Sequence, residues 1–220
     1  MIYSYLLFPI LFFLKLNKFK GQSTFTVICI YSFIFFSSVQ WQDWILDSVL
    51  KKKVYYALYT FLEYVLEYVF FALIIYLNIR NKKYKRIIII LSFGFIAFQL
   101  FYFFTTVTKR SLDTIPVGIE SILTLTFSFY FFYEQLKESV TPIYDHYFFW
   151  IAIGMLIYLC GSFFMYILGN DIPRKQLEEF WFITYIFDTV KNFFFVTSGL
   201  VFLKQSRTVH KTVLPNLDFY

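Results

Sequence analysis

Seven apolar stretches, separated by short segments that carry Lys, Arg or turn residues, make up most of this chain of 220 residues. A helix needs about 20 predominantly apolar residues to cross roughly 30 Å of hydrocarbon, and most of the stretches approach or exceed that length. The connecting segments are too short to form a soluble domain, so neighbouring helices should be antiparallel. We therefore predict an all-α, polytopic membrane helix bundle of seven transmembrane helices, over residues 1–16, 24–40, 54–79, 87–107, 115–136, 147–168 and 180–203.

The composition supports a membrane location and excludes two other classes of chain. Hydrophobic residues make up 59% of the sequence and charged residues only 15%, against about 45–50% and about 25% in soluble domains. Such a chain could neither hide its apolar surface as a soluble globule nor stay disordered. We expect the lipid bilayer as its first partner, and a multi-pass location in the cell inner (plasma) membrane.

The distribution of basic residues predicts the orientation of the bundle, because cytoplasmic segments of membrane proteins carry an excess of Lys and Arg. The segments after the first, third and fifth stretches, with the C-terminal tail, carry twelve of these residues, against seven on the other side. We therefore expect the N-terminus outside and the C-terminus in the cytoplasm. Residues 1–203 form the predicted transmembrane domain, and residues 204–220 form a short cytoplasmic tail.

The first apolar stretch is the shortest of the seven. Lys15 follows only 14 residues, which is about 21 Å of helix. A secretory signal peptide would carry basic residues before its apolar run, whereas here the basic residues follow it. We expect a short membrane anchor whose Lys15 side chain reaches toward the interface.

The small number of reactive residues excludes several chemistries. Two histidines, His146 and His210, and two cysteines, Cys29 and Cys160, cannot form a His/Cys zinc site, a metalloprotease helix or a disulfide framework. The sequence contains no Gly-rich phosphate loop, no Gly-x-Ser-x-Gly motif and no kinase signature. Its Lys and Arg residues are dispersed, which is not typical of nucleic-acid binding. We predict no metal, no cofactor and no catalytic residue, and rank an enzyme last among the functional classes.

Two of the stretches carry acidic residues far from their ends. Glu63 and Glu67 are four residues apart, within a Leu-Glu-Tyr-Val sequence that occurs twice, so both carboxylates lie on one helical face. Glu120 begins a polar face of the fifth stretch, and Thr124 and Ser128 continue it at steps of four residues. An intramembrane carboxylate is costly, so these residues should face the interior of the bundle.

The last stretch carries charges of both signs. Asp188 and Lys191 are three residues apart, and Asn192 lies one turn from the aspartate. The two charges together cost about 5–7 kcal/mol at mid-membrane, while the apolar residues of the stretch return about 4–8 kcal/mol. The helix would be marginal if both charges faced lipid, so they should face the bundle interior, pair with each other or contact water.

Counted from the ends of their helices, these ionisable residues lie at compatible depths. Four carboxylates would then share one ammonium, and a proton or a bound cation would compensate the excess negative charge. One interpretation is an ion-paired polar core that only fixes helix register. The interpretation that we favour is an intramembrane pocket for a ligand or an ion, formed by Glu63, Glu67, Glu120, Asp188, Lys191 and Asn192.

Small residues in the sixth stretch predict a close contact between helices. Gly154 and Gly161 are seven residues apart and share one helical face, with Ser162 beside them. Small residues at this spacing allow the backbone of a neighbouring helix to approach. We expect this face to be a packing surface.

Three families of seven-helix proteins offer a comparison. Microbial rhodopsins place an Asp four residues before the retinal Lys, whereas Asp188 and Lys191 are three apart. Transporters of the SWEET or PQ-loop type pair the first helix with the fifth and the third with the seventh. Prolines in the first and fifth stretches and charged pairs in the third and seventh loosely match that symmetry: Pro9 with Pro116, and Glu63/Glu67 with Asp188/Lys191. The Pro-Gln dipeptide of these transporters is missing here. Residues 149–164 and 187–195 resemble the sixth and seventh helices of uncharacterised bacterial seven-helix proteins that are sometimes encoded near two-component sensor kinases. This resemblance implies a sensory or accessory membrane role and supplies no catalytic residue.

Two functional hypotheses follow. The first is a non-enzymatic sensor or accessory subunit, which binds a small ligand or cation in the polar pocket and signals through a membrane or cytoplasmic partner. The second is a cation- or proton-coupled transporter of small molecules that uses the same carboxylates. The sequence leaves open whether the protein forms a homo-oligomer.

Overall fold

A computed structural model of the chain describes residues 3–48, 53–106, 114–138, 142–168, 179–180 and 182–212. The side chains are described over 3–40, 58–105, 115–137, 142–165, 179–180 and 182–205. Three segments that entered the predicted charge balance lie outside the residues whose side chains are described: Lys51–Lys53, 109–113 and 170–175. The described part is helical and contains no strand. Its helices are α1 (Ser4–Leu14), α2 (Leu16–Phe19), α3 (Ser23–Ser48), α4 (Lys53–Asn78), α5 (Lys82–Thr106), α6 (Thr114–Glu138), the 3₁₀ turn η1 (Ile143–Asp145), α7 (Tyr147–Leu168) and α9 (Phe182–Thr212).

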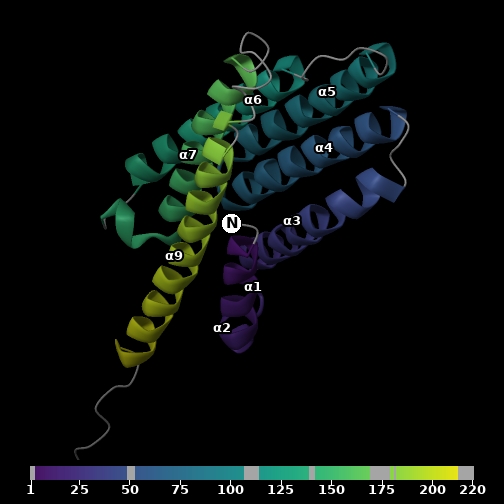
Figure 1. Ribbon diagram of the computed structural model, residues 1–220. Helices are drawn as coiled ribbons and strands as arrows, with labels where there is room; N and C mark the ends of the chain where they lie inside the picture. Colours follow the sequence, from purple (N-terminus) through teal and green to yellow (C-terminus); the bar gives the residue numbers. More distant parts are fainter. Residues whose placement is uncertain are drawn as a thin grey trace, which may run out of the picture.

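The long helices form one bundle, in which α3, α4, α5 and α6 follow one another and α7 and α9 pack as a pair (Figure 1). Six helices are long and apolar enough to cross a membrane: α3, α4, α5, α6, α7 and α9. The coarse prediction of a multi-pass helical membrane protein is thus confirmed for the described residues. The last helix continues to Thr212, so the beginning of the predicted tail is helical.

The first of the seven predicted spans, residues 1–16, is not confirmed as a membrane crossing. Helix α1 has 11 residues, which gives it a length of about 16 Å, roughly half of a membrane crossing. Its first turn lies beside the middle of α9, where Asn192 donates a hydrogen bond of 3.0 Å to the hydroxyl of Ser4. Helix α1 ends at Leu14, Lys15 caps it, and α2 begins at Leu16. Helix α1 therefore lines only one half of the bundle.

Aromatic side chains fill the junction between α1, α2, α3 and α9. Phe19 is fully buried and stacks on Phe12 and Phe202, with ring centroids 5.5 and 5.6 Å apart. Phe8 and Phe25 complete this cluster, which fixes α1 against the lower part of α9 in Figure 1. We refer to this side of the bundle, where α2 lies and α4 meets α5, as the α2 end.

Helices α7 and α9 approach each other closely, as the small residues of α7 predict. A Cβ atom at Gly154 would lie 2.7 Å from Cβ of Phe194, and one at Gly161 would overlap the ring of Phe187. The prediction of a packing face at Gly154 and Gly161 is confirmed. This contact matters for the site, because it sets the position of the residues of α9 between Phe187 and Phe194.

A buried carboxylate holds the connection between α4 and α5. Glu134 of α6 accepts hydrogen bonds from the backbone N–H groups of Arg80, at 2.9 Å, and Asn81, at 2.8 Å. The Asn81 side chain in turn accepts the N–H of Lys83 and caps the first turn of α5. Glu134 is therefore a structural residue at the α2 end, and the sequence did not suggest this role.

Candidate functional site

Lys191 is the centre of a charged cluster inside the bundle. It is fully buried, in the middle of α9. Its ammonium donates one hydrogen bond to Asp188, at 2.5 Å, and another to the hydroxyl of Tyr31 on α3, also at 2.5 Å. The carboxylate of Glu67 on α4 lies 4.0 Å from the same nitrogen. A buried ammonium is therefore compensated by carboxylates from two helices.

Tyr31 connects the two sides of this ion pair. Its hydroxyl accepts a hydrogen bond from Lys191 and donates one to Glu67, at 3.3 Å. The side chains of Glu67 and Asp188 keep 13% and 14% of their surface exposed, whereas Lys191 keeps none. The positive charge is thus enclosed, and the carboxylates that surround it form the accessible side of the cluster.

Aromatic rings from four helices enclose the ammonium. The ring centroid of Tyr158 on α7 lies 3.9 Å from Nζ of Lys191, and that of Tyr31 lies 4.9 Å away. The rings of Tyr5 on α1 and Phe71 on α4 follow at 5.5 and 5.6 Å. A cation within about 6 Å of a ring face is attracted by the quadrupole of the ring, most strongly when water is excluded. The surroundings of Lys191 are therefore those of a binding site for an organic cation, which the chain fills with its own side chain.

Glu63 lies one turn before Glu67 on α4 and outside the direct contacts of Lys191. Its carboxylate accepts hydrogen bonds from Ser38, at 2.9 Å, and from the hydroxyl of Tyr59, at 3.2 Å. Within the described part of the chain, neither of these partners is a cation. Glu63 therefore adds a third carboxyl group beside the cluster, without an ion pair to Lys191.

The other two predicted site residues lie outside this contact network. Asn192 bonds Ser4 and so holds α1 rather than a ligand group. Glu120 is buried, with 3% of its surface exposed, and its Oε1 has no hydrogen-bond partner among the described residues. The structure thus joins Glu67, Asp188 and Lys191 directly and places Glu63 one turn from Glu67, whereas no hydrogen bond or ion pair among the described residues links Glu120 or Asn192 to these groups.

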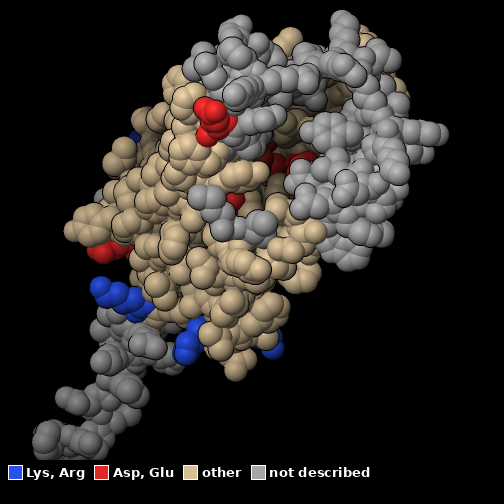
Figure 2. Space-filling model, in the orientation of Figure 1, with Lys and Arg blue, Asp and Glu red and all other residues tan. Residues whose placement is uncertain are grey.

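Figure 2 shows where Asp and Glu atoms are visible on one face of the molecule. On the face shown, acidic atoms are visible inside a recess in the upper half, while Lys and Arg atoms gather toward the lower end, near α2 and the end of α9. Because α1 begins at Ser4, it lines the lower half of this face, and no other helix of the described residues takes its place in the upper half.

The tyrosines of the cluster are functional candidates that the sequence argument missed. Tyr31, Tyr158 and Tyr5 lie in runs of apolar residues and differ from the many phenylalanines around them only by a hydroxyl. A tyrosine far from a span end, where the hydroxyl cannot reach water, is a signal comparable to an intramembrane acid. Applied to this chain, that rule would have drawn attention to Tyr31.

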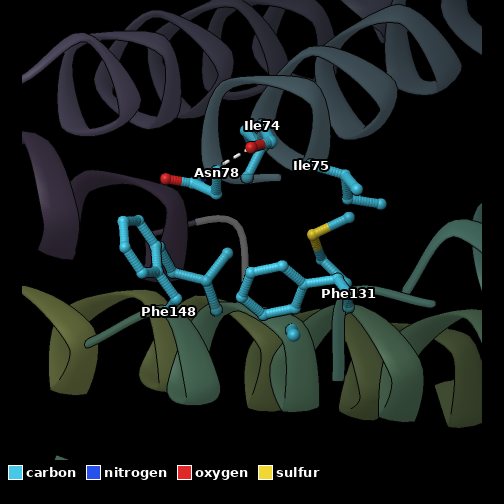
Figure 3. A pocket seen from close by; sticks show the side chains of 8 residues that line it. Ile74, Ile75, Asn78, Phe131 and Phe148 are labelled. Atoms are coloured by element: carbon cyan, nitrogen blue, oxygen red, sulfur yellow. Dashed lines mark hydrogen bonds between the residues drawn. The ribbon is translucent and has the colours of Figure 1, made fainter. Parts of the chain in front are cut away.

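A small cavity elsewhere in the bundle is almost entirely apolar. It lies between α4, α6 and α7, has a volume of about 10 Å³, and is lined by six aliphatic and aromatic side chains with Ala152 and Asn78 (Figure 3). The Asn78 amide is already used, since it donates to the carbonyl of Ile74 and accepts from Thr24. This cavity offers room for about one water molecule and no free polar group, so it is a packing defect rather than a binding site.

The described residues contain no group of three His, Cys, Asp or Glu side chains that could hold a metal ion. Comparison with known proteins adds no further information about the site, because no family model, curated protein or solved structure matches the chain.

Proposed function

We propose that this protein is a non-enzymatic membrane sensor or accessory subunit that binds a small cationic ligand among the carboxylates around Lys191. The observation that carries the proposal is the enclosed ammonium of Lys191 between Asp188 and Glu67, with a further carboxylate, Glu63, beside it. Three carboxylates meet one ammonium there. The surplus negative charge, in a mostly apolar surrounding, favours a positively charged ligand.

The proposed orientation places the α2 end in the cytoplasm, together with the C-terminus, and opens the recess outward. The basic residues of the segments 15–20 and 80–86 lie at the α2 end, which agrees with the excess of positive charge on cytoplasmic segments. The first turn of α1 then points outward.

A cation that binds the carboxylates would weaken their hold on Lys191. The ammonium of Lys191 contacts residues of α1, α3, α4 and α7 as well as of its own helix, α9. A change in the position of Lys191 therefore alters the packing of five helices. A ligand shifts a conformational equilibrium only by its difference in affinity for the two states. We propose that a separate membrane or cytoplasmic partner detects this change at the α2 end.

The ligand step is tested with methylammonium chloride as the probe, on protein in lipid nanodiscs. We expect a saturable rise in the thermal unfolding midpoint, which the double variant Glu63→Gln/Glu67→Gln abolishes. The variant Glu134→Gln removes a carboxylate of the α2 end and should keep the response. The proposal fails if no rise occurs, or if the double variant responds as the wild type does.

The signalling step needs a separate experiment. A photo-crosslinking residue at position 83, at the α2 end, should join the protein to a defined partner in its native membrane. We expect the yield of this adduct to change when methylammonium is added, and Glu63→Gln/Glu67→Gln to remove that change. The absence of any adduct from position 83 and from neighbouring positions of the α2 end would contradict the role as a sensor or accessory subunit.

A cation- or proton-coupled transporter is the second candidate. It is favoured by the range of exposure of the carboxylates, from the partly exposed Glu63 and Glu67 to the buried Glu120 on the neighbouring helix α6. Such a series could pass a cation into the bundle. Reconstituted vesicles should then show cation-driven flux that Glu63→Gln/Glu67→Gln removes, and flux that persists in this variant would exclude the mechanism.

A further inference from the structure

The inner face of α6 carries polar atoms that have no partner. Glu120, Thr124 and Ser128 follow one another at steps of one turn, and their exposed fractions are 3%, 0% and 0%. Oε1 of Glu120 and the hydroxyls of Thr124 and Ser128 make no hydrogen bond within the described residues. Gln99 of α5, which is 2% exposed, contributes a fourth unpartnered polar group, its Nε2. Buried polar groups are normally satisfied, so four in one region require an explanation.

Other hydroxyls in the same bundle show that a position on a helix does not force a hydroxyl to remain without a hydrogen-bond partner. Thr126, also on α6, donates to the carbonyl of Ile122 at 2.7 Å, and Ser162 on α7 donates to that of Tyr158 at 2.7 Å. Thr189 and Thr197 on α9 bond the preceding turn in the same way. Thr124 and Ser128 have the same opportunity but do not use it. Their hydroxyls are instead available to a group inside the bundle.

Gln99 lies on a helix that contacts α6, at a depth similar to that of Glu120. Gln99 lies one turn from Phe95, whose ring packs on Tyr68 of α4 with centroids 4.3 Å apart, so both residues are on the side of α5 that faces α4. Counted at 1.5 Å per residue, Gln99 lies about 10 Å from the end of α5 at Thr106, and Glu120 about 9 Å from the beginning of α6 at Thr114. The two side chains therefore share a depth in the bundle.

An ionised Glu120 would have no compensating positive charge among the described side chains. No described Lys or Arg forms an ion pair with it, and the charged side chain that acts on it is a second carboxylate, Glu67. Lys191 is already engaged by Asp188, Tyr31 and Glu67. A carboxylate in this apolar interior needs a positive partner.

We propose that a sodium ion binds between Glu120, Thr124 and Gln99. The ligands would be the carboxylate of Glu120, the hydroxyl of Thr124 one turn away, and the amide oxygen of Gln99. For this, the Gln99 amide rotates so that its oxygen takes the place of the unpartnered Nε2. All three ligands are then oxygen atoms that suit a hard cation. Ser128 lies a further turn along the same face and would bind a water of the ion's hydration shell. A single carboxylate favours a monovalent ion over a divalent one, which usually takes several charged ligands.

This inference rests on residues that do not bind the ligand of the proposed function, so either can fail without the other. The experiment compares thermal unfolding midpoints in nanodiscs in sodium chloride, potassium chloride and choline chloride at equal ionic strength and constant pH. Because an ion that binds only the folded state stabilises it, sodium should raise the midpoint saturably, by about 3 °C or more over choline. Equal midpoints in sodium and choline would overturn the inference. So would a midpoint that depends on pH but not on sodium, since the charge of Glu120 would then be neutralised by a proton.

Two substitutions locate the ion. Glu120→Gln should abolish the sodium response, and Thr124→Val should raise the half-maximal sodium concentration about tenfold or more. Thr124→Val also keeps the test valid if Glu120→Gln does not fold. Replacement of an unpartnered buried hydroxyl by a methyl group would leave the sodium response unchanged if no ion were bound there. Glu134→Gln, a carboxylate substitution elsewhere on α6, should retain the wild-type sodium response. A response that persists in Glu120→Gln, or one that Thr124→Val leaves unaltered, contradicts the proposed site.

Discussion

At the scale of single residues, the enclosed ammonium of Lys191 explains why a lysine is tolerated in the middle of α9. Its charge is shared by Asp188 and Glu67, and its stem is buried among aromatic rings. The pair on α9 could be inferred from the spacing of residues 188 and 191 alone. The contribution of Glu67 could not, because it depends on how α4 is rotated and placed against α9.

Substitution of Lys191 by Met should therefore destabilise the bundle. It leaves two carboxylates without their cation, and breaking a buried ion pair on one side costs about 3–5 kcal/mol. The measurement is the free energy of unfolding in bicelles. Adding Asp188→Asn to Lys191→Met should recover part of the lost unfolding free energy, because it removes one uncompensated charge. A double variant that is even less stable than Lys191→Met would contradict this interpretation.

Tyr31→Phe is a milder test of the same cluster. The substitution keeps the ring over the ammonium but removes the hydroxyl that joins Lys191 to Glu67. We expect a loss of about 1–2 kcal/mol in unfolding free energy, which is typical for a hydrogen bond to a charged group. Tyr133→Phe removes an exposed hydroxyl of α6 and should change the stability little. Equal effects of the two substitutions would show that the hydroxyl of Tyr31 has no special role.

At the scale of helices, the close contact of α7 with α9 determines where the residues around Lys191 lie. The sequence predicted this contact because glycines at a seven-residue spacing have few other uses in a membrane helix. It did not predict which helix would fill the space. Phe187 and Phe194 of α9 do so, on either side of the site residues Asp188 and Lys191.

Gly161→Val should disrupt this contact. The new side chain would overlap the ring of Phe187, and overpacking of this kind costs about 1–3 kcal/mol. Gly94→Ala is the matched control, because nothing lies within 4 Å of a Cβ atom at that position of α5. Thermal unfolding midpoints should fall for Gly161→Val and stay level or rise for Gly94→Ala. A midpoint of Gly161→Val equal to that of the wild type would contradict the packing of α7 on α9.

At the scale of the whole molecule, the half-length helix α1 separates this bundle from a simple seven-span protein. Six spans follow from length and hydropathy alone. Their ends were predicted to within about two residues, except for the end of α3, the beginning of α5 and the end of α9. The limited reach of α1 could not be derived in this way. It depends on the contacts of Ser4 with Asn192 and of Phe19 with Phe202, which join residues far apart in the sequence.

The proposed orientation gives a further prediction. In a background of Cys29→Ala and Cys160→Ala, a cysteine at position 83 should react with a membrane-impermeant maleimide only in inverted membrane vesicles. A cysteine at position 179 should react in intact cells, because it lies at the opposite end of the bundle. The reverse pattern would place the α2 end outside and would contradict the proposed outward opening of the recess.

The convergence of α4 and α9 on one charged cluster is tested most directly by a double-mutant cycle between Lys191→Met and Glu67→Gln, measured as the free energy of unfolding in bicelles. The two side chains lie 4.0 Å apart across the helix interface. A coupling energy of about 1 kcal/mol or more, of the sign that favours the intact pair, is the predicted result. Effects that add to within about 0.3–0.5 kcal/mol would show that the two charges do not meet, and would remove the basis of the proposed site.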